Sequence, residues 1–290
     1  TILTINSIYY LNYSNLYNIQ VFIMLKIKKK AKFKHHQNRM KNEGDIKNSR
    51  AFFYSKKSKN LHFLIEKRFD WMNDYIDFDS KGLEVGTGPG LSKEFIKCKD
   101  FKISDYTNDE FLDYKNINVL GTPFSENSFD FIICSNMIHH VPYPKLFFKE
   151  MNRILKKNGK LIIQDVSCSV MHQIITLIMK HEGFNFETDV FSTKESCTDN
   201  DDLWSGNIAI PDMIFEDKES FYKNINGFKI IHHKYSEFLC FINSGGVISK
   251  TFYVPLNKFF LKTFDLIDRA LTRLFPSIFA LQQQLVLIKL

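Results

Sequence analysis

The sequence lacks cysteines at metal-binding spacing. Its five cysteines are widely scattered, and no two of them form a C-x-x-C pair. This spacing indicates neither a zinc site nor a disulfide framework, so we predict no metal site. We interpret the cysteines as reduced thiols of a cytoplasmic protein, most of them serving as small apolar fillers. They are Cys98, Cys134, Cys168, Cys197 and Cys240.

Long apolar runs are also missing. The most apolar early stretch, residues 21–25, is far shorter than the roughly 20 residues that a membrane-spanning helix needs. The basic cluster that begins at Lys26 follows this stretch, whereas a secretory signal carries its positive charge in front. The sequence begins with Thr1, and we expect Met24 to be the true start, in which case residues 1–23 are not translated.

Acidic residues are scarce in the first 60 positions, which hold thirteen Lys or Arg against two acids, a net charge of +11. The rest of the chain has a net charge of −4. We therefore expect residues 1–47 to be a disordered basic tail. Such a tail can bind nucleic acid or anionic lipid, but we favour the simpler interpretation of a solvated arm.

Strand and helix patterns alternate after a helical lead or lid over residues 48–78. Short apolar strands are predicted at 82–85, 101–104, 129–134 and 160–164, with helices from 91 and over 144–155. An insertion, residues 167–226, precedes further strands at 228–231 and 285–288. This order predicts an α/β fold with a doubly wound, mostly parallel sheet.

A C-terminal helical element is expected over residues 239–280, with an amphipathic helix at 256–275. Its apolar positions include Phe259, Phe260, Ile267 and Leu274. An apolar stripe of this kind more often packs on a core than on a membrane, so peripheral membrane contact is not favoured.

A glycine-rich turn follows the first strand of the sheet. Residues 83–90 read L-E-V-G-T-G-P-G, and glycine tolerates the positive φ that lets backbone approach a ligand. The spacing is G-x-G-x-G. A dinucleotide-binding turn would read G-x-G-x-x-G, and Leu91 stands where that motif needs glycine.

The turn resembles motif I of the class I S-adenosylmethionine-dependent methyltransferases, type 11-like. Four further segments continue the resemblance in the family's order, so that it covers residues 79–166 closely and extends loosely to the C-terminus, which implies a methyltransferase domain over residues 79–290. Asn118 stands where the family commonly has Asp, and Thr122 where it has Leu. The resemblance implies a Rossmann-like, seven-stranded sheet with helical and loop insertions, and S-adenosylmethionine as the cofactor. The four segments are Asp105, N-V-L-G-T-P-F at 118–124, S-F-D-F-I-I-C-S-N at 128–136 and E-M-N-R-I-L-K-K-N-G at 150–159.

The resemblance also implies cofactor-binding residues. The glycines would surround the amino-acid part of the cofactor, and Asp105 would hold the ribose hydroxyls, since a carboxylate accepts two hydrogen bonds from a diol. Glu84 would either fix the cofactor's amino group or organise the loop. The full set is Glu84, Gly86, Thr87, Gly88, Gly90, Asp105, Asn118, Val119, Ser135 and Asn136.

His139 and His140 are the candidate catalytic bases, because they follow a strand at the carboxyl end of the sheet, where α/β proteins bind ligands. The alternative is that this pair is a structural feature shared by family members. His181 and Glu182 form a second candidate pair. Trp204 would either stack on an acceptor or plug the core.

We therefore predict a methyltransferase that acts on an oxygen or nitrogen of a small molecule or saccharide. One alternative is an RNA or protein methyltransferase recruited by the basic arm, and another is a non-catalytic cofactor-binding module. The mildly acidic body disfavours nucleic acid, because nucleic-acid binders show positive charge across the binding face. The N-P-P-Y signature of many base-amino methyltransferases is also absent after the strand at 129–134.

Overall fold

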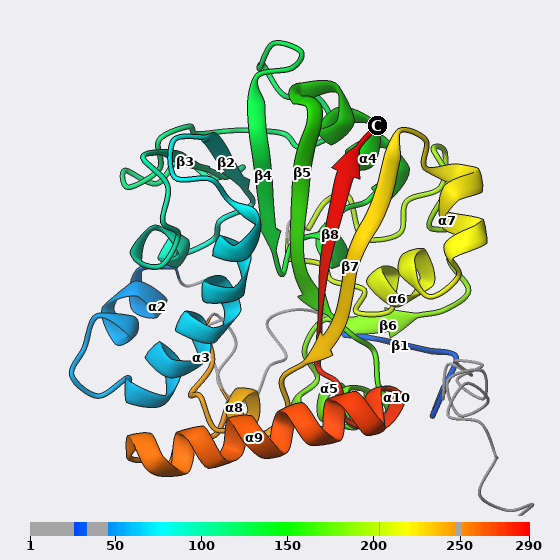
Figure 1. The fold of residues 1–290 in the computed structure, drawn as a ribbon. Helices are drawn as coiled ribbons and strands as arrows, with labels where there is room; N and C mark the ends of the chain where they lie inside the picture. The colour runs from blue at the N-terminus through cyan, green and yellow to red at the C-terminus, as the bar shows by residue number, and fades with distance from the viewer. Residues whose placement is uncertain (1–25, 34–45, 203, 248–250) are drawn as a thin grey trace, which may run out of the picture.

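The computed structural model describes residues 26–33, 46–202, 204–247 and 251–290, so the expectations for residues 1–25 and 34–45, Met24 included, lie outside it. A sheet with helices on both sides dominates this part of the chain (Figure 1). Its helices and helical turns are α2 (Ile46–Phe53), α3 (Lys59–Asp70), η3 (Trp71–Tyr75), η4 (Leu91–Glu94), η5 (Ile138–His140), α4 (Pro144–Ile154), α5 (Val170–Met179), α6 (Ile210–Phe215), α7 (Lys218–Asn224), α8 (Leu239–Ile242), α9 (Lys258–Leu274) and α10 (Pro276–Phe279). Its strands are β1 (Lys30–Lys32), β2 (Lys81–Val85), β3 (Asp100–Ser104), β4 (Phe129–Ser135), β5 (Leu155–Val166), β6 (Gly183–Asn185), β7 (Phe228–Ser236) and β8 (Gln282–Lys289).

The main sheet has the strand order β3-β2-β4-β5-β8-β7. β3, β2, β4 and β5 are parallel, and β8 runs antiparallel to both of its neighbours. The predicted doubly wound, mostly parallel α/β sheet is confirmed. The expected number of seven strands is wrong for the described residues, which form six in this sheet. After β3 the chain makes turns and one isolated bridge, between Ser104 and Tyr114, in place of a further strand.

The central strand β4 is buried on both faces, which explains its nearly continuous apolar sequence. Along β4, Ile132 and Cys134 pack into the core beneath α4, α6 and α7. Phe131 and Ile133 point the opposite way, into the core beneath α3. The alternation follows from the two-residue period of a strand.

Part of the predicted disordered tail is ordered. β1 pairs antiparallel with β6, with Lys30 opposite Asn185. The Phe33 N–H donates to the Glu182 carbonyl, which extends this pairing. Charge composition could not reveal the pairing, because the partner strand lies in the distant insertion.

Helix α9 does not bury its apolar stripe, contrary to the expectation that the stripe packs on the core. Phe259 is 72% exposed and Leu274 64% exposed, whereas Asp268 is only 3% exposed. The Asp268 carboxylate turns inward because it accepts the backbone N–H groups of Phe238, Leu239 and Cys240 at the start of α8. In the described part of the chain, no helix is both long and apolar enough to cross a membrane.

Candidate active site

A cavity of about 470 Å³ lies where β2, β4 and β5 end. Parallel strands place their carboxyl ends at one edge of the sheet, so the loops that follow them meet there. All but one of the predicted site residues line this cavity, and the exception is Gly90. The lining residues among them are Glu84, Gly86, Thr87, Gly88, Asp105, Asn118, Val119, Ser135, Asn136, His139 and His140.

The glycine turn after β2 needs glycine at its first and last positions. Gly86 has φ +63°, and a Cβ there would lie 2.3 Å from Cγ of Met137. Gly90 has φ +66°, and a Cβ there would lie 2.9 Å from the Phe111 ring. Gly90 therefore serves the packing of the turn, while Gly86 and Gly88 face the cavity.

Glu84 organises this turn from beneath. Its buried carboxylate accepts hydrogen bonds from the hydroxyls of Thr87 and Ser92. Burial raises the pKa of Glu84 to about 7. The loop-organising role is thus visible in the structure, and contact with a cofactor amino group stays a prediction.

Asp105 follows β3 and joins it to the glycine turn. Its Oδ2 accepts the Gly88 N–H at 2.8 Å, and its Oδ1 accepts the Thr107 N–H at 3.2 Å. Burial raises the pKa of Asp105, although the backbone donors of Gly88 and Thr107 act in the opposite direction. The carboxylate reaches the cavity with lone pairs still open, since each oxygen accepts two bonds.

The remaining predicted cofactor residues are held by local contacts. The side-chain oxygen of Asn118 accepts the Leu120 N–H at 2.9 Å and keeps a second lone pair. Asn136 has φ +51°, and its side-chain oxygen accepts a hydrogen bond from Gln282 of β8 at 2.7 Å. Ser135 ends β4 beside it.

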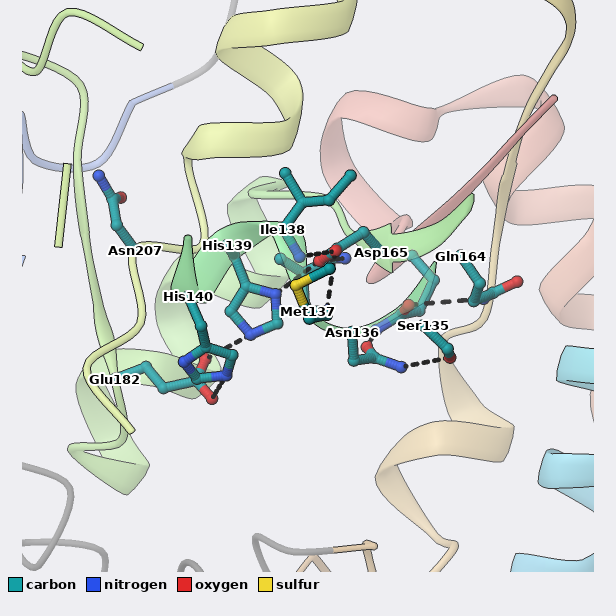
Figure 2. Close-up of polar contacts among 12 residues, drawn as sticks. Ser135, Asn136, Met137, Ile138, His139, His140, Gln164, Asp165, Glu182 and Asn207 are labelled. Carbon is teal, nitrogen blue, oxygen red and sulfur yellow. Dashed lines mark hydrogen bonds and ion pairs between the residues drawn. The ribbon is translucent and has the colours of Figure 1, made fainter. Parts of the chain in front are cut away.

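His139 lies on η5 and is fixed by Asp165 at the end of β5 (Figure 2). Its Nδ1 donates to Asp165 Oδ1 at 2.5 Å. The other oxygen of Asp165 accepts the Met137 and Ile138 N–H groups, so the carboxylate is itself held in place. Burial opposes a charge on His139, but Asp165 and Glu182 outweigh it and raise the pKa of the imidazole to about 10.

The pKa of His140 is shifted in the opposite direction to that of His139. Burial, helped by the adjacent His139, lowers the pKa of His140 to about 4. Its Nδ1 donates to the Ser205 carbonyl at 3.2 Å. Trp204 lines the same side of the cavity, with its ring centroid 6.5 Å from that of His140.

Glu182 joins the two histidines, as Figure 2 shows. Its carboxylate oxygens lie 3.5 Å from Nε2 of His139 and 3.6 Å from Nε2 of His140. His181 bonds to the same carboxylate at 2.9 Å. Burial opposes ionisation, but the positive charges of His181 and His139 hold the pKa of Glu182 well below its usual range. The two candidate pairs predicted from the sequence thus form one cluster.

The sequence prediction missed Asp165 and His172. Asp165 lies at the carboxyl end of an apolar strand, at the same edge of the sheet as Asp105, and that signal could have identified it. His172 lines the cavity from α5, with its Nδ1 2.8 Å from the Ser167 carbonyl. It follows no strand, so the sequence offers no comparable signal.

Comparison with known proteins places the glycine turn in a family. Residues 81–163 match the family described as a methyltransferase domain. An uncharacterised protein of Methanocaldococcus jannaschii is 33% identical over 102 residues, which cover 34% of this chain and 44% of that protein. A ubiquinone biosynthesis O-methyltransferase of Idiomarina loihiensis is 25% identical over 138 residues, covering 41% and 57%. The matched segment spans less than half of the first relative. A solved methyltransferase from Archaeoglobus fulgidus aligns with a TM-score of 0.49 at 12% identity, over 83% of this chain and 99% of that one.

The family match identifies residues 81–163 as a methyltransferase domain, in agreement with the predicted class and with S-adenosylmethionine as the cofactor. The residues present fit this group. Gly86 and Gly88 add no side chains at two of the positions where the turn lines the cavity, and both have positive φ. Asp105 and Asn118 offer the acceptors that ribose hydroxyls and an adenine amino group require.

Proposed function

We propose that this chain, which carries a class I S-adenosylmethionine-dependent methyltransferase domain, methylates an oxygen or nitrogen of a small molecule or saccharide. The observation that supports this most is that one cavity is lined by both the glycine turn and the His139–His140 pair. Its volume of about 470 Å³ lies within the usual range for small-ligand sites, about 300–1,000 Å³.

The residues divide the work of such a reaction by position. Gly86, Gly88 and Asp105 hold the cofactor at one end of the cavity. Trp204 and the two histidines line the space that is left for an acceptor at the other end. When bound, S-adenosylmethionine supplies a methyl group on a sulfonium, whose C–S bond breaks as the bond to the acceptor forms. The main task of the protein is then alignment, with reacting atoms about 3 Å apart.

A hydroxyl acceptor needs its proton removed, whereas an amine need only be present in its neutral form. Both histidines use Nδ1 as a donor, to Asp165 and to Ser205 respectively. Nε2 is therefore the nitrogen of each ring that is directed toward Glu182. His140, whose pKa is lowered to about 4, is neutral, so its Nε2 can take the acceptor's proton. His139, whose pKa is raised to about 10, is already protonated at neutral pH and cannot.

Calorimetric titration of the full chain with S-adenosylmethionine and with S-adenosylhomocysteine tests the cofactor half of the proposal. We expect micromolar binding of both. Transfer of labelled methyl groups to a panel of sugars, hydroxylated metabolites and small amines then tests the acceptor class. Failure of a folded protein to bind either nucleoside would overturn the proposal, and transfer only to RNA or protein would replace the acceptor class.

A further inference from the structure

Three groups with metal-binding chemistry converge at the acceptor end of the cavity. His139, His140 and Glu182 each offer one ligand atom, and these atoms all lie within 4.8 Å of one another. The histidines are adjacent on η5, whereas Glu182 precedes β6 in the insertion. The fold, and not the local sequence, brings the three together.

The distances in this cluster suit an ion better than direct hydrogen bonds. Each oxygen of Glu182 faces one histidine Nε2, at 3.5 and 3.6 Å. These separations exceed those of ordinary N–H···O bonds, about 2.7–3.2 Å. Tetrahedral nitrogen and oxygen ligands about 2.1 Å from one zinc ion lie about 3.4 Å apart.

The surroundings of the cluster orient its ligand atoms. Asp165 accepts from Nδ1 of His139, and the Ser205 carbonyl accepts from Nδ1 of His140, which leaves Nε2 of each ring as the ligating atom. A carboxylate or carbonyl behind a histidine is the usual second layer of metal sites. Asp165 and Glu182 also place buried negative charge around the rings, which favours a cation among them.

Residues 204–207, W-S-G-N, are built around these three groups. The Ser205 carbonyl holds His140, and the Asn207 N–H donates to the His139 carbonyl at 2.9 Å. A Cβ at Gly206 would lie 2.8 Å from Cγ of Glu182, so glycine makes room for that side chain. Glu182 itself has φ +56°, a strained conformation for a residue with a side chain.

We propose that His139, His140 and Glu182 bind a divalent transition-metal ion, with zinc the best match. Three protein ligands leave a fourth position open toward the cavity, as in catalytic zinc sites. Resting on the proposed function, this site selects acceptors with a hydroxyl oxygen, which binds the ion and loses its proton to water more readily there. His181, bonded to Glu182 at 2.9 Å, orients the carboxylate.

Zinc titration of the full chain, without an affinity tag and freed of metal by a chelator that is then removed, tests the site. We expect one zinc ion per chain by calorimetry, and the absorption of a tetrahedral site when cobalt replaces zinc. Glu182→Gln keeps the shape of the side chain but removes its charge, and should weaken zinc binding by about a hundredfold or more. Asp165→Asn should weaken it by about 10–100-fold, the usual effect of a second-layer change.

His233→Gln is the control, since His233 is a half-buried histidine of β7 that lies outside both the cavity and the cluster. It should bind zinc as the unaltered protein does. S-adenosylmethionine titration of the same samples shows that each variant is folded. If the unaltered protein bound the cofactor but not zinc, the metal site would be overturned and the proposed function would stand. If it bound zinc but not the cofactor, the proposed function would be overturned and the metal site would stand. Glu182→Gln that binds zinc normally would also overturn the site.

A separate observation concerns the exposed face of α9. Phe259, Phe260, Leu266, Ile267 and Leu274 are all exposed. At 100° per residue they fall on one stripe, and the four basic residues of the helix fall along one flank of it. Just before the helix, Phe252 is 71% exposed and Val254 62% exposed. The basic residues are Lys258, Lys262, Arg269 and Arg273.

From this face we infer that α9 docks flat on an anionic lipid surface. An apolar stripe beside a basic row is the pattern of helices that lie in the plane of a membrane interface, with the stripe among the acyl chains and the cations at the headgroups. The basic row would attract a negatively charged lipid surface and would gain nothing from a neutral apolar partner, so it favours anionic lipid as the occupant. The helix is held by its polar side, through Asp268, so its apolar side is free to insert.

Co-sedimentation of the full chain with vesicles tests this docking. We expect binding to vesicles of phosphatidylcholine with about one-third phosphatidylglycerol, and at least tenfold weaker binding to phosphatidylcholine alone. The double variant Phe259→Ser, Leu266→Ser should lose at least tenfold. Ile178→Ser, an apolar residue 62% exposed on α5, is the matched control. If the chain did not bind anionic vesicles, the docking would be overturned. If instead the chain self-associated and the double variant abolished this, the occupant of the face would be a second copy of the chain.

Discussion

The two ends of the cavity are built in different ways. At the cofactor end, the turn over residues 83–90 and Asp105 come from two neighbouring strands, and Gly86 and Gly88 add no side chains where the turn lines the cavity. At the acceptor end, the side chains of His139, His140 and Glu182 do the lining, and they are held by Asp165 and residues 204–207.

This difference explains why only one end could be assigned from the sequence. A turn that must have positive φ imposes glycine at fixed spacing, and that spacing survives in the sequence as a motif. A cluster of side chains from η5, the insertion and the end of β5 has no fixed spacing. If the ends are also independent in energy, a change at one should leave the binding of the other's ligand unaltered.

Gly88→Arg should produce the largest effect, loss of detectable S-adenosylmethionine binding. Gly88 faces the cavity with φ +55°, so a long side chain would fill the cofactor end and strain the turn. Gly121→Arg is the control, because a Cβ at Gly121 meets nothing within 4 Å. Calorimetry should show near-normal affinity for the control. Retained affinity in Gly88→Arg would place the cofactor elsewhere.

Asp105→Ala should weaken cofactor binding by roughly a hundredfold or more. The carboxylate would lose charge-assisted hydrogen bonds, each worth about 1.5–3 kcal/mol, and the Gly88 N–H would lose its partner. Asp105→Asn keeps one acceptor oxygen, so its cofactor affinity should lie between those of the unaltered protein and Asp105→Ala. Equilibrium titrations of all three proteins measure this series, and equal affinities would show that another residue holds the ribose.

The pH dependence of cofactor binding should report on Glu84, whose pKa is raised to about 7 by burial. In the free protein this carboxyl gains a proton as the pH falls below about 7, whereas a cofactor with a positive amino group favours the ionised form. Affinity should therefore rise roughly fivefold from pH 6 to pH 7 and about twofold more above pH 7, where it levels off. Glu84→Gln should flatten the profile, since it cannot ionise. If affinity depended on pH equally in both proteins, Glu84 would not be the group that titrates.

The sequence predicted most of the sheet, since β2, β3, β4 and β5 overlap the expected strands. It overestimated the helix expected from residue 91, which is only the helical turn η4 (Leu91–Glu94). It also could not show that β1 pairs with β6, because that register depends on two segments more than a hundred residues apart.

Helices α4 and α9 show the same limit. Both have a clear apolar stripe, yet α4 buries Phe147 and Met151 against the sheet, whereas α9 exposes Phe259 and buries Asp268. Periodicity indicates that a helix has two faces. Which face turns inward depends on the groups it meets there. For α9 these are the backbone N–H groups at the start of α8, which have no helical partner and donate to Asp268 instead.

Trp204→Ala should have the smallest effect on the cofactor, a change in S-adenosylmethionine affinity of less than about twofold. Trp204 borders the acceptor end beside His140, while the cofactor end is built from other elements. Sites without shared partners usually contribute additively, so the double variant with Asp105→Ala should bind the cofactor as Asp105→Ala alone does. Methyl transfer to an acceptor should fall in Trp204→Ala and recover in part in Trp204→Phe, which keeps an aromatic face. A clear loss of cofactor affinity in Trp204→Ala would mean that the two ends are coupled through the histidine cluster, and that the acceptor end takes part in holding the cofactor.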